Sequence, residues 1–170
     1  MNQLLKSIVF VIFVFPLSLG AQASSKAGAV FNKMKTLVGT WKKEGQSHSD
    51  FTISFELTAN NSTLLEIWNY KGKKHSLTVY HQNGEKLMAT HYCPQGNQPR
   101  LELTESSTMN AISFRFFDAT NLESLDKSHQ HYLGFEFPKS MDRVVRSETY
   151  TSYKGEKESV LILVKGDESS

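Results

Sequence analysis

Apolar and polar residues alternate along much of this chain with the two-residue period of a β-strand that has one buried face. The pattern is clearest in residues 51–58, where every second position from Phe51 to Leu57 is apolar and the others are polar or charged. Comparable runs recur at intervals of about ten residues, separated by turn-forming residues, which is typical of an all-β domain. With a first strand that contains Trp41, the predicted strands are residues 51–58, 64–69, 76–81, 86–93, 100–104, 111–118, 129–137, 143–152 and 158–164.

The order of these runs favours an up-and-down antiparallel barrel of about ten strands over a β-sandwich. Neighbouring strands are joined by short turns, and Asn83-Gly84 is a strong hairpin signal. Before the first strand, Phe31, Met34 and Leu37 recur at helical spacing. This spacing predicts a short N-terminal helix, residues 30–37, that plugs the barrel.

The first 23 residues have the pattern of a secretory signal peptide. Lys6 precedes a largely apolar run, residues 7–19, and Ala21-Gln22-Ala23 fits the rule for cleavage before Ser24. A membrane anchor is the alternative, but the run is shorter than the ~20 apolar residues that a spanning helix needs. We therefore expect residues 24–170 to form a single domain that is periplasmic or secreted, without stable membrane insertion.

Charge and cysteine content limit the partners and the sources of stability. Without Lys6 the formal charge falls from +2 to +1, and no run of basic residues is present, so nothing favours nucleic-acid binding. A single cysteine excludes an internal disulfide bond. Cys93 is therefore either a small buried residue or a free thiol.

The register of the Asn83-Gly84 hairpin decides which side chains face the barrel interior. A loop of Asn83-Gly84 alone would set Val79 opposite Met88, and a three-residue loop, 82–84, would set it opposite residue 87. The three-residue loop collects the more apolar face. It also places His75 opposite His91, away from the turn, and on that basis we prefer it.

Two further strands carry polar residues at one end of an apolar face. His129 and His131 share a face with Leu133, and Asp118 shares a face with Phe114. The adjacent loops, 94–99 and 119–128, fall at the same end of the barrel if the strands alternate up and down. The sequence thus predicts a polar, titratable cluster around one barrel opening.

Several motifs carry a resemblance to known proteins. A glycine and a tryptophan two residues apart at the start of the first strand resemble the opening of lipocalins and related calycin barrels. The rest of the chain resembles a family of exported bacterial proteins with calycin-like barrels, for which no activity is assigned. The resemblance implies the fold and the position of a site, but no reaction. Its motifs are Gly39-Thr40-Trp41, Thr90-His91-Tyr92-Cys93, Gly96-Asn97-Gln98-Pro99-Arg100, Asp118-Ala119-Thr120-Asn121-Leu122 and His129-Gln130-His131.

The histidines suggest a metal site as one hypothesis. His91, His129 and His131, with the thiol of Cys93, are ligand types that suit Zn or Cu. The alternative is that these histidines only donate and accept hydrogen bonds at the barrel rim. Haem held by one axial histidine is a third interpretation, but no haem motif is present.

The loop between the fifth and sixth predicted strands offers ligand-binding groups. Gly96 can adopt a positive φ, and Asn97 can hydrogen-bond its own backbone, so the loop is stiff. Arg100 could present its planar fork to a carboxylate or phosphate of a ligand. Equally, it could form an internal salt bridge with Asp118 or Glu102.

Catalysis has weaker support in the sequence. Cys93 with His91 or His129 could form a thiolate–imidazole pair, but an inert buried thiol explains the residue as well. Asp118 and Asn121 are typical of an Asx-type turn. No nucleophile elbow, Walker loop or dinucleotide fingerprint is present, so whether the protein is an enzyme stays open.

Together these features predict an exported protein that binds a small, partly apolar ligand with an anionic group in a barrel cavity. The alternatives are a Zn- or Cu-binding protein and a metal-dependent or cysteine enzyme that uses the same residues. The predicted ligand-binding residues are His75, His91, Tyr92, Cys93, Asn97, Arg100, Asp118, Asn121, His129 and His131.

Overall fold

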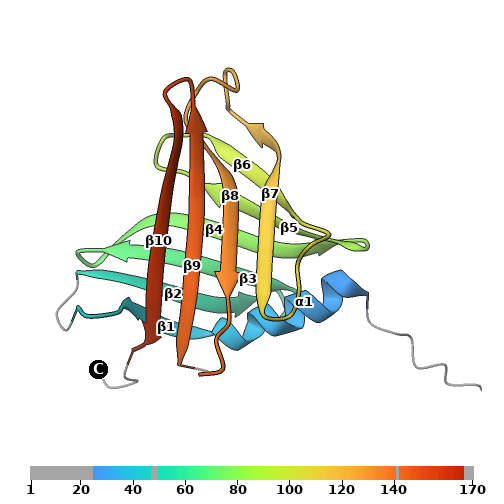
Figure 1. Cartoon of the computed structure of the whole chain (residues 1–170), viewed down its shortest axis with the longest axis vertical. Coiled ribbons are helices and arrows are strands. Elements are labelled where there is room, and N and C mark those ends of the chain that lie inside the picture. The colour runs from blue at the N-terminus through green and yellow to red at the C-terminus, as the bar shows by residue number, and fades with distance from the viewer. Residues whose placement is uncertain (1–24, 47–49, 141, 167–170) are drawn as a thin grey trace, which may run out of the picture.

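The protein is a closed antiparallel β-barrel of ten strands (Figure 1). The computed structural model describes residues 25–46, 50–140 and 142–166. Each strand pairs with its neighbours in sequence, and β1 pairs with β10 to close the sheet, which confirms the predicted all-β barrel. The strands are β1 Gly39–Lys43, β2 Phe51–Thr58, β3 Thr63–Tyr70, β4 Lys73–Asn83, β5 Lys86–Tyr92, β6 Gln98–Leu103, β7 Ala111–Thr120, β8 His129–Glu136, β9 Arg143–Ser152 and β10 Gly155–Lys165.

In the described part of the chain, helix α1 (Lys26–Met34) precedes the barrel and continues into a 3₁₀ turn (Lys35–Leu37). It begins earlier than predicted because Ser25 caps it: the Ser25 hydroxyl accepts a hydrogen bond from the Gly28 amide at 3.2 Å. None of the helices within the described ranges is long and apolar enough to cross a membrane. The predicted signal peptide, residues 1–23, lies outside those ranges.

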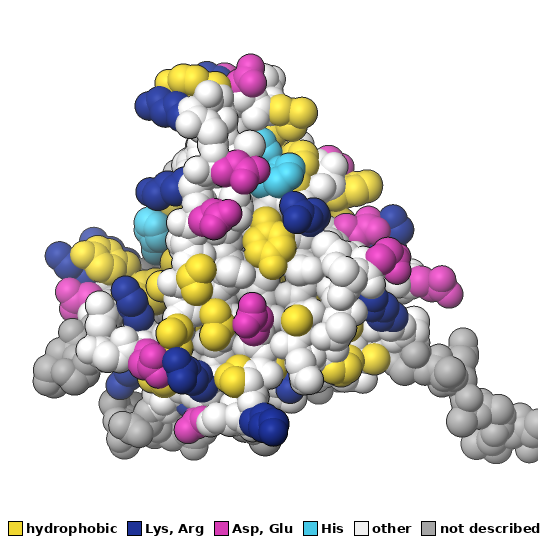
Figure 2. All heavy atoms as spheres, viewed as in Figure 1, with side chains coloured by type: hydrophobic (Ala, Val, Ile, Leu, Met, Phe, Trp, Pro, Cys, Tyr) yellow, Lys and Arg dark blue, Asp and Glu magenta, His cyan; other side chains and the backbone are white. Residues whose placement is uncertain are grey.

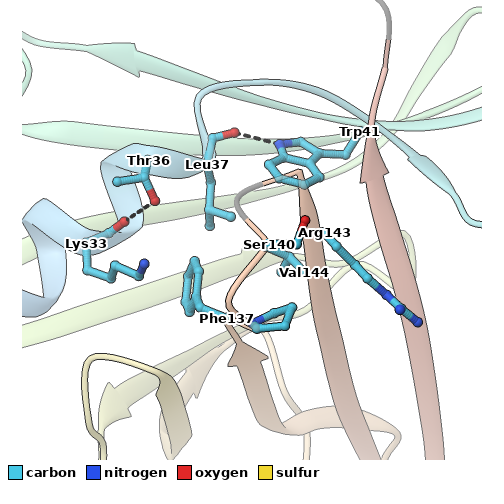
Figure 3. Close-up of a pocket in the computed structure, with 9 residues that line it drawn as sticks. Lys33, Thr36, Leu37, Trp41, Phe137, Ser140, Arg143 and Val144 are labelled. Atoms are coloured by element: carbon cyan, nitrogen blue, oxygen red, sulfur yellow. Dashed lines mark hydrogen bonds between the residues drawn. The ribbon is translucent and has the colours of Figure 1, made fainter.

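Helix α1 lies beside one end of the barrel and closes it (Figure 1). The buried Trp41 indole donates a hydrogen bond to the Leu37 carbonyl at 2.6 Å, which joins the 3₁₀ turn to β1. Lys33 lies 4.5 Å from the centroid of the Phe137 ring, on the β8–β9 connection (Figure 3). A small cavity of about 30 Å³ lies among the side chains that join α1 to the barrel, and we call this end the closed end.

The interior is apolar next to α1 and polar toward the opposite end. The apolar part of the core includes Met34, Trp41, Phe55, Phe114 and Phe135, all buried. The other part contains buried polar and charged side chains: Glu66, Thr78, His91, Gln130 and Arg146. Because buried charges need partners, the polar part of the interior requires its own network of hydrogen bonds.

Three β-bulges interrupt the ladders. Each adds one residue to a strand, and the extra residues are His75 in β4, Phe117 in β7 and His131 in β8. Beyond an extra residue the side chains change faces relative to a regular strand. Two of the histidines predicted to face the barrel opening are therefore the residues that the ladders leave unpaired.

The register of the β4–β5 hairpin differs from both predicted registers. Asn83 pairs with Lys86, so the loop is Gly84-Glu85, with Gly84 at a positive φ of 61°. Thr78 consequently lies opposite His91, and both are buried. The prediction that His75 faces His91 is wrong, because His75 is an exposed bulge residue.

Candidate functional site

Three connections meet at the end of the barrel opposite α1. Two hydrogen bonds join the β5–β6 loop to the β7–β8 loop. The side-chain amide of Asn97 donates to the Ser128 carbonyl at 2.9 Å, and the side-chain amide of Asn121 donates to the Gly96 carbonyl at 2.6 Å. The β9–β10 hairpin joins them through a hydrogen bond from the Tyr153 amide to the Asp126 carbonyl at 2.9 Å. These contacts confirm that the two predicted loops lie at the same barrel end.

A pocket of about 510 Å³ lies between these connections. Its wall includes Gln95, Ser128 and the β9–β10 hairpin. Glu148 and Ser159, which are paired across β9 and β10, line it together with Tyr150. We call this cavity, with Glu148, Tyr150 and Ser159 as its floor, the barrel-end pocket.

Arg146 lies behind the floor and connects it to the far wall of the barrel. Its Nε donates to Glu66 Oε1 at 2.7 Å, and its Nη1 donates to Glu148 Oε2 at 2.9 Å. The side chains of Arg146 and Glu66 are both 0% exposed. Burial by itself lowers the pKa of Arg146, but the two carboxylates raise it above its usual value. The guanidinium therefore stays charged and holds the two acids together.

Glu66 on β3 is held by three donors. Its carboxylate accepts hydrogen bonds from the Trp68 indole at 2.6 Å, from Arg146 at 2.7 Å and from the Tyr80 hydroxyl. Burial, and then the Glu66 charge, raise the pKa of Tyr80 well above its usual value. Tyr80 thus remains a hydrogen-bond donor, and three protein donors satisfy the Glu66 carboxylate.

Glu148 is the acid that faces the pocket. Burial acts to raise its pKa, but the Arg146 guanidinium outweighs burial and lowers the pKa below its usual value. Gln130 Nε2 donates to Glu148 Oε2 at 3.1 Å and supports the same ionised form. The floor of the barrel-end pocket therefore carries a negative charge at neutral pH.

His91 lies deeper than predicted and has partners at both ring nitrogens. Nδ1 is 2.9 Å from the Thr78 hydroxyl, and Nε2 is 3.1 Å from the Tyr150 hydroxyl. Burial, and then the nearby Arg146, lower the pKa of His91 to about 4, so the ring is neutral at pH 7. Cys93 is 8% exposed, and its electrostatic interaction with Tyr150 adds to the effect of burial in raising the pKa of Tyr150.

The other two histidines lie on β8 around Phe116. The Phe116 ring centroid is 4.6 Å from that of His129 and 5.7 Å from that of His131. His129 is buried, with Nδ1 2.8 Å from the Lys127 carbonyl. His131 lines a groove on the outer wall with Arg115. In the part of the chain that the structure describes, no three metal-ligating side chains converge, so the geometry does not support the predicted three-histidine site.

Three predicted residues lie on the outer wall rather than at the opening. Arg100 and Asp118 form a salt bridge with side chains 46% and 41% exposed, so the internal salt bridge left open by the sequence is the one that forms. The bulge at Phe117 turns Asp118 away from the face of Phe114, which corrects the prediction that they share a face. Tyr92 is 49% exposed. In Figure 2 acidic and basic side chains are mixed across the visible wall.

The sequence interpretation missed the residues that form the floor network. Arg146, Glu148 and Tyr150 occupy alternate positions of one predicted strand, 143–152, and therefore share a face. Glu66 is the one charged residue in the otherwise apolar run 64–68. The polar face of strand 143–152 and the single charge in run 64–68 could each have indicated a buried charge network, because a charge in a buried strand requires a buried partner.

No protein-family model matches the chain, and no curated protein is similar to it in sequence. The likeness to exported calycin-like proteins therefore stays a prediction. The description of the site depends on its geometry and on the chemistry of its side chains.

Replacing Asn97 with alanine is expected to loosen the loops at the open end. The change removes the hydrogen bond to the Ser128 carbonyl, which should destabilise the protein by about 1–2 kcal/mol. Amide hydrogen exchange in residues 121–128 should become faster, whereas exchange in α1 should not change. Asn83→Ala, in the exposed β4–β5 hairpin, is the control. Unchanged exchange in residues 121–128 would show that Asn97 does not hold the loops together.

Proposed function

We propose that the protein is an exported small-molecule binding protein and that its site is the barrel-end pocket. The observation that carries this proposal is a cavity of about 510 Å³ over a buried, hydrogen-bonded floor of charged and polar groups. Pockets that bind small molecules commonly have volumes of about 300–1,000 Å³ and a few fixed polar groups. The leader-like pattern of residues 1–23 supports a periplasmic or secreted location.

The energetics of the floor support a role in binding. Glu66 and Arg146 are fully buried, and replacing such a pair by apolar residues of similar volume is often neutral or stabilising by about 1–4 kcal/mol. A barrel that needed only stability would be served by an apolar interior. Charged groups that are held rigidly below an opening are instead suited to orienting a polar ligand.

The structure weakens the earlier expectation that Arg100 receives an anionic ligand group. Arg100 lies on the outer wall and is paired with Asp118. The charged residues that line the pocket are Glu148, Lys154, Glu156 and Lys157, and the charged group at its floor is the Glu148 carboxylate. The ligand that we propose is therefore a small polar molecule, without a requirement for an anionic group.

The metal and cysteine-enzyme alternatives have no specific support. Both ring nitrogens of His91 already have partners, Thr78 and Tyr150. Cys93 is buried, and among the described residues no hydrogen bond joins its thiol to an imidazole. A catalytic thiol would need access to substrate and a base within hydrogen-bonding reach.

Native mass spectrometry of protein released from its source cell should show a bound small molecule. Ser152→Trp, which fills the barrel-end pocket, should reduce its occupancy by about 10-fold, since the side chain that replaces Ser152 lies in the pocket wall. Val160→Trp, on the exposed outer face of β10, is the matched control and should retain the molecule. Equal occupancy in the two variants would place the site elsewhere, and an empty wild-type protein would count against the proposal.

A further inference from the structure

The charged groups below the barrel-end pocket do not balance. Glu66 and Glu148 share one guanidinium, that of Arg146, so two carboxylates and one cation leave a net charge of −1. His91 contributes no positive charge at neutral pH, because its pKa is lowered to about 4 by burial. Among the described residues Arg146 is the only buried cation. Lys154 and Lys157 also line the pocket, but among the described residues neither forms a salt bridge with Glu148, so a cationic partner for this surplus negative charge comes from outside the network.

The surplus charge is open to the pocket through Glu148. Its Oε2 accepts hydrogen bonds from Arg146 and Gln130, whereas among the described residues its Oε1 has only the Ser159 hydroxyl as a donor, at a long 3.4 Å. Glu148 lines the pocket, with its side chain 12% exposed. A carboxylate oxygen that lacks a strong donor at the floor of a cavity is a site for a hydrogen-bond donor with a positive charge.

A second acceptor beside Glu148 also lacks a donor. Gln130 is fully buried, and its Oε1 has no hydrogen-bond partner within the described ranges, although Nε2 of the same amide contacts Glu148. Arg146 Nη2 is the one donor of this network without a partner, but it belongs to a guanidinium that already lies between two carboxylates. Gln130 lies behind the pocket and does not line it, so the acceptor at the pocket floor that lacks a strong donor is Glu148 Oε1, which a protonated amine can satisfy.

Resting on the proposed function, we infer that the ligand of the barrel-end pocket is a small molecule with a protonated amine. Its ammonium group binds Glu148 Oε1 at the floor, and the Tyr150 hydroxyl is the neighbouring acceptor in the pocket lining. The ligand supplies the charge that the buried network lacks. The rest of the molecule extends past Ser152 toward the opening between the β5–β6 loop and the β9–β10 hairpin.

The test compares three probes of similar size: 2-phenylethylamine, 2-phenylethanol and 3-phenylpropanoate. Binding to the full mature chain is followed by NMR shifts of the backbone amides around Glu148 and Ser159. The amine should bind at least ~10-fold more tightly than the alcohol or the carboxylate, because a hydrogen bond to a charged group adds this much. Glu148→Gln should remove the preference, and Glu158→Gln, which changes the same charge on the outer wall, should keep it.

A second pair of variants tests the inference even if Glu148→Gln fails to fold. Ser159→Lys places a tethered ammonium beside Glu148 Oε1 and should weaken amine binding by at least ~10-fold relative to Ser159→Met, which adds similar bulk without charge. If the alcohol or the carboxylate binds the pocket as tightly as the amine, the inference is wrong and the proposed function stands. If no small molecule shifts these amides, both are wrong.

Discussion

Replacing Arg146 with methionine is expected to destabilise the barrel by about 3–5 kcal/mol, because it leaves two carboxylates in the interior without a cation. Glu66 is fully buried and cannot recover its lost partner from water. Methionine approximates the length of arginine, so the loss reflects charge more than volume. Equilibrium unfolding in urea at neutral pH measures the change in the free energy of unfolding.

Arg143→Met is the matched control for this prediction. Arg143 lies on the same strand, but its salt bridge with Glu44 is exposed, and such pairs contribute about 0–1 kcal/mol. Adding Glu66→Gln to Arg146→Met should restore part of the lost stability, because it removes one of the unpaired charges. Similar losses in the Arg146 and Arg143 variants would show that the buried network does not hold the barrel together.

Acid is expected to destabilise the protein between about pH 6.5 and pH 4 through His91. In the unfolded chain this histidine binds a proton near its usual pKa of 6.5, whereas in the folded protein burial delays protonation to about pH 4. The unfolded state therefore binds more protons in this window, and stability falls as the pH falls. The contribution is fully present above pH 6.5, is lost by about pH 4, and amounts to about 3 kcal/mol.

His91→Gln should flatten this part of the stability curve, measured as the free energy of unfolding in urea at a series of pH values. The variant will be less stable at neutral pH, since glutamine cannot reproduce both contacts of the ring, so the comparison is between slopes. His75→Gln, at an exposed bulge, should keep the wild-type slope. If the free energy of unfolding changes with pH in the same way in wild type and His91→Gln, the fold does not hinder protonation of the His91 imidazole.

The meeting of the two predicted loops at one barrel end was predictable because it follows from connectivity. Strands that alternate in direction bring every second loop to the same end, and the hydrogen bonds of Asn97 and Asn121 show the two predicted loops in contact. The composition of the floor was not predictable in this way. Glu66 and Arg146 are 80 positions apart, and the sequence around either residue does not indicate that the other is its partner.

The prediction of which side chains face the barrel interior was wrong at the bulges. His75, Phe117 and His131 are extra residues in otherwise regular ladders, and each changes which neighbours face inward. At His75 the alternation of apolar residues does not reveal the extra residue, because the positions on both sides of it, Lys74 and Ser76, are polar. As a result the histidines were assigned to the opening, whereas Gln130 and Tyr150 in fact lie near the floor.

By itself the sequence determined the strands, their order around the barrel and the plug at one end, because each of these follows from periodicity and turns within a few residues. The tertiary structure decided which side chains point into the barrel at the polar ends of the strands. It also decided which residues pair with the buried charges. The physical reason is that strand register is set by pairing across the sheet. A buried carboxylate is also stable only where distant strands bring donors to it, as Tyr80 and Arg146 do for Glu66.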